Sequence, residues 1–310
     1  MTGYLTTVSG EIWRLPELLQ WEILRTDGSS CDSARVVFLY EPVRLDVLKN
    51  AVRLRLEENG KTEFFGVVDE FTAGVGSEGR RVELSCRGLM ALLMDSQLPA
   101  AQYAVFQKKD AEEKLLKPFG VDKAELGQVA GLRNFSWDTG TTPWQALCGY
   151  LRHAGAPKPR FSADGTLLLQ ASSGKWSLTD NCAYTQVQLR QRRYGVVARQ
   201  LVITAGGGQE VAENKAFQAL GGTAQKVAMK TGKTLKAIWR TGKQRMEDAC
   251  AGAFTVTVTL PGCLAAEPGD TVQANLERAG VKGDFILVSV KKSCSRDGMK
   301  TVLELEGGLG

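Results

Sequence analysis

The stretch that decides the fold is Phe254-Thr-Val-Thr-Val-Thr-Leu260. Its alternation of apolar and polar side chains is typical of a β-strand with one buried face. A loop that contains Pro268-Gly-Asp270 follows, and further β-like segments then run to Glu306. Short strands separated by tight turns indicate a small antiparallel β module at this end of the chain.

The same pattern occurs a second time, in weaker form, between Val36 and Ser85. One offset of 220 residues joins seven matched positions, among them a Leu-Glu pair and a turn glycine. After a slip of one residue, Phe64 and Val67 match Phe285 and Val288, and Arg81–Leu84 matches Val302–Leu305. We interpret the two stretches as copies of one module, built as a small barrel or a strongly curved sheet. The seven matches are Val36/Val256, Phe38/Val258, Tyr40/Leu260, Val52/Val272, Leu56/Leu276, Glu57/Glu277 and Gly60/Gly280.

The composition is typical of a soluble globular protein. Hydrophobic residues make up 43% of the 310 residues and charged residues 24%, and no apolar run is long enough for a membrane helix. The length fits two or three domains, and the N-terminus lacks the pattern of a secretory signal. Seven cysteines without a Cys-x-x-Cys pair predict reduced, mostly buried thiols. The net charge of +5 permits an acidic partner.

The region between the two copies mixes helices with strands. Leu89–Met94 is a helical apolar cluster, and Lys108–Lys117 has the spacing of an amphipathic helix. Residues 135–155 predict a strand and then a helix with a threonine cap and Pro143 in its first turn. Asp164-Gly165 predicts the turn of a hairpin.

An insertion from about Gly206 to Gly252 interrupts the second copy. It follows Arg199–Thr204, which we expect to play the part of Trp21–Thr26 in the first copy. Between Lys226 and Arg245 the insertion holds seven Lys or Arg and no Asp or Glu. We expect a hairpin here and then a helix over Met246–Gly252. The candidate partner-binding basic patch consists of Lys226, Lys230, Lys233, Lys236, Arg240, Lys243 and Arg245.

This basic patch has three interpretations. It can be a solvated surface hairpin, a contact for an acidic protein, or a contact for nucleic-acid phosphates. Trp239 lies within it and could stack on a base, or pack into a small core beside Ile238.

The sequence supplies little for catalysis. His153 is the single histidine, which excludes a site with several histidine ligands from one chain. Cys148 lies five residues before it, which is the wrong spacing for one helical face. Thr231-Gly-Lys-Thr lacks the earlier glycine of a phosphate-binding loop, because Val227 stands there. We predict no catalytic, cofactor or metal site.

The middle region resembles a known family. Its residues 135–151 read Phe-x-Trp-Asp-x-Gly-Thr-Thr-Pro-Trp-Gln-Ala-Leu-x-x-Tyr-Leu, followed by the Asp164-Gly hairpin. This pattern resembles the late-control and baseplate hub proteins of phage tails and related contractile injection systems. Glu267-Pro-Gly-Asp-Thr-Val272 and Gly298-x-x-Thr-x-Leu-x-Leu305 resemble the last domain of that family, so the likeness covers most of residues 34–306.

The resemblance implies two tube-like β-barrels per chain and a homotrimer in which six barrels form a ring (3 × 2 = 6). Such a ring would adapt a sixfold tail tube to a threefold spike. The implied partners are the tail tube protein, the spike protein, a tape-measure protein and other baseplate proteins, with DNA only in transit through the lumen and no membrane anchor. The sequence lacks a lysozyme-like or peptidoglycan-binding segment, so we extend no cell-wall activity to it.

These observations give one prediction of fold and a ranked set of functions. We predict a mainly β fold with an α+β middle region, in which two duplicated tube-like antiparallel β-barrel domains (1–95 and 183–310) flank a mixed domain (96–182). The leading hypothesis is a non-enzymatic structural protein of the virion tail, a baseplate hub made in the cytoplasm of the bacterial host. The alternative is a β-barrel protein that binds single-stranded nucleic acid through residues 226–245. A third hypothesis, a two-domain hydrolase, needs a cross-domain carboxylate pair that the sequence does not identify.

Overall fold

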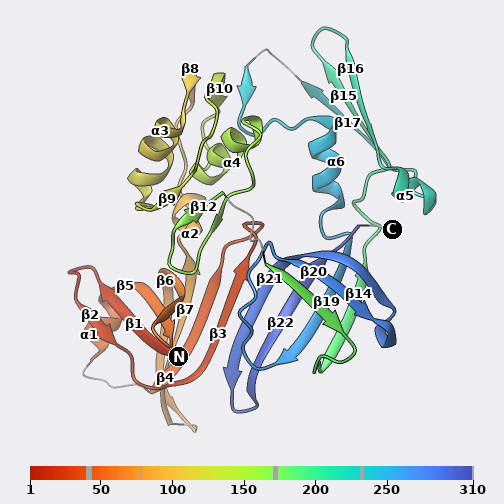
Figure 1. The fold of residues 1–310 in the computed structure, drawn as a ribbon. Helices are drawn as coiled ribbons and strands as arrows, with labels where there is room; N and C mark the ends of the chain where they lie inside the picture. Colours follow the sequence, from red (N-terminus) through yellow and green to blue (C-terminus); the bar gives the residue numbers. More distant parts are fainter. Residues whose placement is uncertain (40–43, 78, 170–173, 231–233, 309–310) are drawn as a thin grey trace.

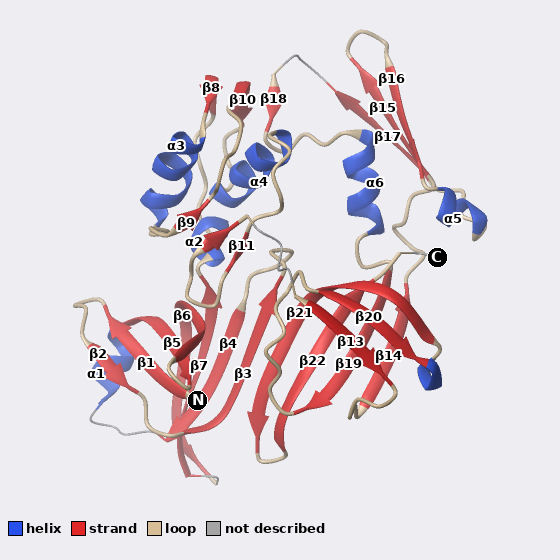
Figure 2. Ribbon diagram, in the orientation of Figure 1, coloured by secondary structure: helices blue, strands red, loops and turns tan. Residues whose placement is uncertain are grey.

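The computed structural model describes residues 1–39, 44–77, 79–169, 174–230 and 234–308. These residues are mainly β, as predicted, with 49% in strands and 18% in helices. One large sheet of 13 strands fills the lower half of Figure 1, and the middle region and the insertion lie above it. Figure 2 shows that most helices lie outside this sheet.

The first part of the large sheet comes from residues 2–88. Along β5, Leu54 and Leu56 are fully buried, whereas Arg53 and Arg55 lie on the other face. The buried face packs with Trp21 and neighbouring apolar side chains into one core. The elements are β1 (Thr2–Thr7), β2 (Ile12–Arg14), β3 (Leu18–Thr26), β4 (Ser33–Leu39), α1 (Leu45–Asn50), β5 (Ala51–Glu58), β6 (Lys61–Gly76) and β7 (Gly79–Gly88).

The second part of the sheet comes from the C-terminal third of the chain. The alternation along Phe254–Leu260 is confirmed, because Val256 and Val258 are fully buried in a separate core with Leu303 and Leu305. The elements are β13 (Lys175–Thr179), β14 (Gln186–Gln191), β19 (Phe254–Pro261), β20 (Thr271–Leu276), η4 (Glu277–Ala279), β21 (Val281–Ser295) and β22 (Gly298–Glu306).

The two parts join edge to edge through β21. The first half of β21 pairs with β20, its second half pairs with β3, and β22 lies along its opposite edge. The strand order is therefore β14-β19-β22-β21-β3-β4-β7-β6-β5-β1-β2, with β20 and β13 attached beside β21.

The predicted repeat is visible in the strand pairing. The order β4-β7-β6-β5 recurs as β19-β22-β21-β20, and every pair in both sets is antiparallel. Val36 lies opposite Leu84, and the matched Val256 lies opposite Leu305. The turn glycines Gly60 and Gly280 both have positive φ, at 77° and 67°, which explains why glycine stands at this point of both copies.

Two details of the predicted repeat are wrong. The strand that pairs with β19, as β3 pairs with β4, is β14 and not Arg199–Thr204. Phe285 does not take the place of Phe64 either: Leu56 pairs with Phe64, whereas the matched Leu276 pairs with Val281. The cause of the second error is the way in which the two strands are connected. In the first copy the pairing continues to Glu58 and Lys61 around a tight turn at 59–60, whereas in the second copy the pairing ends at Leu276 and Val281 and residues 277–280 form the connection.

The middle region has its own core, in which the rings of Phe106, Phe135, Trp137 and Tyr150 pack together. The predicted helices and the Asp164-Gly hairpin are confirmed. The elements are α2 (Met90–Met94), β8 (Ala101–Phe106), α3 (Lys108–Ala111), η2 (Glu112–Leu116), η3 (Lys117–Phe119), β9 (Ala124–Glu125), β10 (Leu132–Trp137), α4 (Pro143–His153) with Thr142 as its cap, β11 (Arg160–Phe161) and β12 (Leu167–Leu168).

The insertion forms a small sheet covered by a helix. β15 pairs antiparallel with β16 and parallel with β17, while β18 leaves this sheet and pairs with β10 of the middle region. The predicted basic hairpin is therefore wrong, since its two strands lie in different sheets. The predicted helix is present but begins at Gly242. The elements are β15 (Arg199–Thr204), β16 (Gln209–Glu213), α5 (Lys215–Ala219), β17 (Gln225–Lys230), β18 (Leu235–Lys236) and α6 (Gly242–Cys250).

All seven cysteines carry free thiols, as predicted; Cys86 is buried, and the other six are partly buried. Within the described ranges, no helix is long and apolar enough to cross a membrane.

Candidate interaction surfaces

The basic patch is spread over three elements. Lys226 and Lys230 lie on β17, Lys236 on β18, and Lys243 and Arg245 on α6. Arg240 precedes α6, while Lys233 lies outside the described residues. The structure thus separates these cations instead of placing them on one hairpin.

Several of the cations already have partners within the chain. Lys236 forms an ion pair with Asp138, and Arg240 forms one with Asp248 at 2.9 Å. Lys230 and Arg245 both lie over the ring of Trp239, at 5.7 and 5.1 Å from its centroid. Lys226 and Lys243 remain exposed, although the Nζ of Lys243 is 3.8 Å from Glu247.

The insertion is anchored on the middle region through β18 (Figure 2). The amide of Ala237 donates to the carbonyl oxygen of Ser136 at 2.9 Å, and the Nε2 of His153 lies 3.0 Å from the carbonyl oxygen of Lys236. At Gly149 on α4, an added Cβ would lie 2.2 Å from the carbonyl oxygen of Ala237. The single histidine therefore has a structural contact at the end of its helix, and Gly149 permits the close approach of the two segments.

A group of charged side chains lies where the two parts of the sheet meet the middle region. We call Arg25, Asp32, Arg160, Glu267 and Asp270 the junction cluster. The Nη1 of Arg25, a buried residue on β3, lies 2.6 Å from the Oε2 of Glu267, which lies in the loop between β19 and β20. The Nη2 of Arg25 donates to the carbonyl oxygen of Phe161 at 3.5 Å. Arg160 lies 3.8 Å from the same carboxylate of Glu267.

Two carboxylates complete the junction cluster. Asp270 accepts hydrogen bonds from the indole nitrogen of Trp176 at 2.7 Å and from the amide of Gly174 at 3.1 Å. Asp32 accepts one from the amide of Thr26 at 2.8 Å. Burial raises the pKa of Asp32 to about 6, although Arg25 and these hydrogen bonds oppose the rise.

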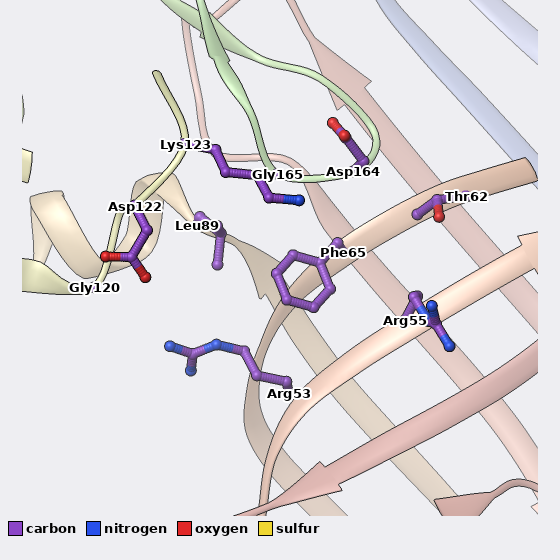
Figure 3. Close-up of a pocket in the computed structure, with 10 residues that line it drawn as sticks. All are labelled: Arg53, Arg55, Thr62, Phe65, Leu89, Gly120, Asp122, Lys123, Asp164 and Gly165. Atoms are coloured by element: carbon purple, nitrogen blue, oxygen red, sulfur yellow. The ribbon is translucent and has the colours of Figure 1, made fainter. Parts of the chain in front are cut away.

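A pocket of about 420 Å³ lies between the outer face of β5 and β6 and the middle region (Figure 3). Its lining combines three cationic side chains with two carboxylates and an apolar floor. The lining residues are Arg53, Arg55, Thr62, Phe65, Leu89, Gly120, Asp122, Lys123, Asp164 and Gly165.

The described residues bear on two kinds of reactive site, metal centres and cysteine nucleophiles. No group of three or more His, Cys, Asp or Glu among them could hold a metal ion. Burial raises the pKa of Cys148 to about 12, which leaves its thiol protonated and a weak nucleophile at neutral pH. Thr231-Gly-Lys lies outside the described residues, so its predicted turn is not tested.

The pocket and the junction cluster were both missed by the sequence analysis. Arg53 and Arg55 alternate with buried leucines, which predicts a solvated strand face and gives no sign of what covers it. Glu267-Pro-Gly-Asp270 has the pattern of a loop, but Arg25, the partner of Glu267, lies 242 residues away in the sequence. A contact of that separation leaves no local signal.

The fold is that of phage tail proteins. The chain matches a tail protein from Neisseria meningitidis over 99% of its length and 96% of the other chain, with a TM-score of 0.78 and 19% identity. It matches the 43 kDa tail protein of prophage MuSo2 from Shewanella oneidensis over 99% and 98%, with a TM-score of 0.77 and 15% identity. No protein-family model and no curated protein sequence matches this chain.

A third similar structure belongs to a secretion machine. The Escherichia coli c3393 protein is a type VI secretion component with structural similarity to the T4 tail proteins gp27 and gp5. The match covers 93% of this chain and 73% of that chain, with a TM-score of 0.55 and 13% identity. The predicted resemblance to tail and baseplate hub proteins is therefore confirmed for the fold.

Proposed function

We propose that this chain is a structural, non-enzymatic protein of a phage tail or a related injection machine, where it forms a homotrimeric hub between tail tube and spike. The similar structures, which are tail proteins and a T4-like secretion component, support this role. In the proposed hub the repeated parts are tube-like barrels within domains 1–95 and 183–310, on either side of domain 96–182. Three separate buried cores, around Leu54, Phe135 and Val256, support this division.

The proposal of a trimer rests on two strand edges that have no partner strand among the described residues. Inside the chain, the second half of β21 pairs with β3. By the internal repeat, β6 corresponds to β21 and β14 corresponds to β3. Among the described residues, however, the stretch Glu70–Gly76 of β6 pairs with β7 alone, and β14 pairs with β19 alone. Exposed edges of this kind favour pairing with another chain.

A neighbouring copy of the chain would close both edges. When β14 of one copy pairs with β6 of the next, the contact between copies repeats the contact inside each copy. A closed ring of this kind leaves no free edge. Three chains supply six parts (3 × 2 = 6), which suits a sixfold tube on one side and a threefold spike on the other. Tape-measure protein and DNA would pass through the lumen, and other baseplate proteins would bind outside.

The test is the native mass in solution. Light scattering should give a trimer of 100.8 kDa (3 × 33.6 kDa). Leu189 on β14 is 42% exposed, so Leu189→Asp should leave the fold intact and yield monomers of 33.6 kDa. Val8, which is 75% exposed in a turn, gives the matched control Val8→Asp, and this variant should remain trimeric. Monomeric wild-type protein, or a trimer that persists in Leu189→Asp, would contradict the proposal.

We propose further that the basic patch contacts an acidic protein of the particle. Its members Lys226 and Lys243 are exposed and therefore accessible to such a partner. The double variant Lys226→Glu/Lys243→Glu should keep its native mass and fail to enter particles, whereas Lys109→Glu, at an exposed site in the middle region, should enter normally. Normal entry of the double variant would reject the contact.

Single-stranded nucleic-acid binding is not favoured. Lys236 and Arg240 are paired with carboxylates, and the ring of Trp239 has Lys230 and Arg245 on it. A base-stacking site would need that ring open.

A further inference from the structure

Three cationic side chains, Arg53, Arg55 and Lys123, line the pocket in Figure 3. Arg55 forms an ion pair with Glu57 at 3.1 Å and lies over the ring of Tyr4, so its charge is compensated. Arg53 has no such ion pair among the described residues, and its Nη1 donates at 3.1 Å to the adjacent carbonyl oxygen of Val52. Burial lowers the pKa of Arg53, because its guanidinium is partly withdrawn from water.

The free energy of anion binding should be favourable at such a site. A partly buried cation without a carboxylate loses hydration and gains no compensating charge. Lys123 lies in the opposite wall of the pocket, where its charge helps to lower the pKa of Asp164, although the two form no ion pair among the described residues. Figure 3 shows the ring of Phe65 between these two side chains. An anion placed near that ring would therefore be attracted by the charges of both cations.

The carboxylates of the pocket restrict which anion fits. Asp164 is occupied by hydrogen bonds from the Ser162 hydroxyl and from the Thr166 amide at 3.3 Å, and these bonds, together with the charge of Lys123, hold its pKa below its usual range. Asp122 lies on the same side of the pocket as Lys123. Two negative charges in the wall repel a dianion such as phosphate more strongly than they repel a single carboxylate.

The rest of the pocket fits an apolar group attached to that anion. Phe65 and Leu89 form the floor, and an added Cβ at Gly165 would lie 2.7 and 2.9 Å from these two side chains. Gly165 and Gly120 have positive φ, at 83° and 77°, a conformation that favours glycine. At these two points the pocket wall is therefore backbone without a side chain. The volume of about 420 Å³ is that of a pocket for a small ligand or one to three peptide residues.

We propose that this pocket binds a carboxylate-bearing peptide segment of a partner protein, with its carboxylate between Arg53 and Lys123 and an adjacent apolar side chain on Phe65 and Leu89. The carboxylate can come from an acidic side chain or from a chain terminus, since both present the same group to the two cations. This inference goes beyond the proposed hub and does not depend on the trimer.

The test is a calorimetric titration of the full chain with three probes. Acetyl-Phe-Asp-amide carries a side-chain carboxylate, acetyl-Asn-Phe with a free C-terminus carries a terminal one, and acetyl-Phe-Asn-amide carries none. At least one acidic probe should bind with Kd below about 1 mM, and the neutral probe should bind at least about tenfold more weakly. The stronger acidic probe identifies the source of the carboxylate.

Variants distinguish binding in the pocket from general electrostatic attraction to a basic protein. Arg53→Gln should weaken the acidic probe at least about tenfold, and Lys123→Gln should weaken it less, because Lys123 is more exposed. Arg80→Gln removes an exposed arginine from β7 and should leave binding unchanged. Equal affinity for the acidic and neutral probes, no binding of any probe, or equal effects of Arg53→Gln and Arg80→Gln would overturn the proposal.

Discussion

Asp32 shows how the surroundings of one residue decide its charge. The loop after β3 places its carboxylate beside Arg25 and Arg160, and both cations stabilise the ionised form. Burial acts in the opposite direction and is the larger effect, so its pKa rises from 3.8 to about 6. A carboxylate with a raised pKa stabilises the fold most when protonated, and this contribution is lost as the pH rises from about 4 to about 6.

Asp32→Asn should therefore be more stable than the wild type above pH 6, and the two should converge near pH 4. Full burial would make the difference about 3 kcal/mol, and because Asp32 is partly exposed we expect roughly 1–2 kcal/mol. Urea unfolding at pH 4, 6 and 8 measures it. Asp46→Asn, at an exposed carboxylate, serves as the control and should show no such change between pH 4 and 6. A wild type more stable than Asp32→Asn at pH 8 would show that the attraction to Arg25 outweighs burial.

At the scale of elements, the contact between α4 and β18 depends on a missing side chain. Gly149 lies in the middle of α4, where alanine would favour the helix more. An added Cβ there would lie 2.2 Å from the carbonyl oxygen and 2.6 Å from the Cα of Ala237. The glycine therefore weakens the helix slightly and permits β18 to reach β10.

Gly149→Ala should displace β18 from the middle region. We expect a loss of about 1–3 kcal/mol in the free energy of unfolding, and faster hydrogen exchange at the amide of Ala237. Gly131→Ala is the matched control, because its Cβ would meet its nearest neighbour at 3.4 Å and its φ is not positive. Hydrogen exchange followed by mass spectrometry checks both. Unchanged exchange at Ala237 would mean that the segment adapts without separating.

The elements also show what the sequence could and could not predict. The alternation in Phe254–Leu260 predicted the strand, because a period of two is a local property of the sequence. The offset of 220 residues predicted the repeat, because matching positions can be compared directly in the sequence. Arg199–Thr204 was assigned to the wrong sheet because its alternation is the same in either sheet. β18 has two residues, which is too short for any period, and its parallel partner β10 is about a hundred residues away.

At the scale of the whole molecule, ion pairs connect the two parts of the sheet in different surroundings: a buried group at Glu267, the pair Lys292–Glu63 at 2.7 Å with side chains 12% exposed, and an exposed pair at Glu22. Glu267 meets Arg25, whose side chain is 7% exposed, and Arg160, whose side chain is 11% exposed. Glu22 on β3 meets Lys291 on β21 at 2.8 Å, with side chains 43% and 39% exposed. The two parts of the sheet are thus joined by buried ion pairs at Glu267 and by an exposed ion pair at Glu22.

Glu267→Ala should destabilise the chain far more than Glu22→Ala. It leaves Arg25 and Arg160 buried without their shared carboxylate, which costs roughly 3 kcal/mol. Loss of the exposed pair costs less than about 1 kcal/mol, because water replaces the lost partner. Urea unfolding of both variants measures the difference, and Glu267→Gln, which keeps a hydrogen-bond acceptor, should fall between them. Equal losses in Glu267→Ala and Glu22→Ala would place the stability of the junction in the backbone pairing of β21 with β3 rather than in the junction cluster.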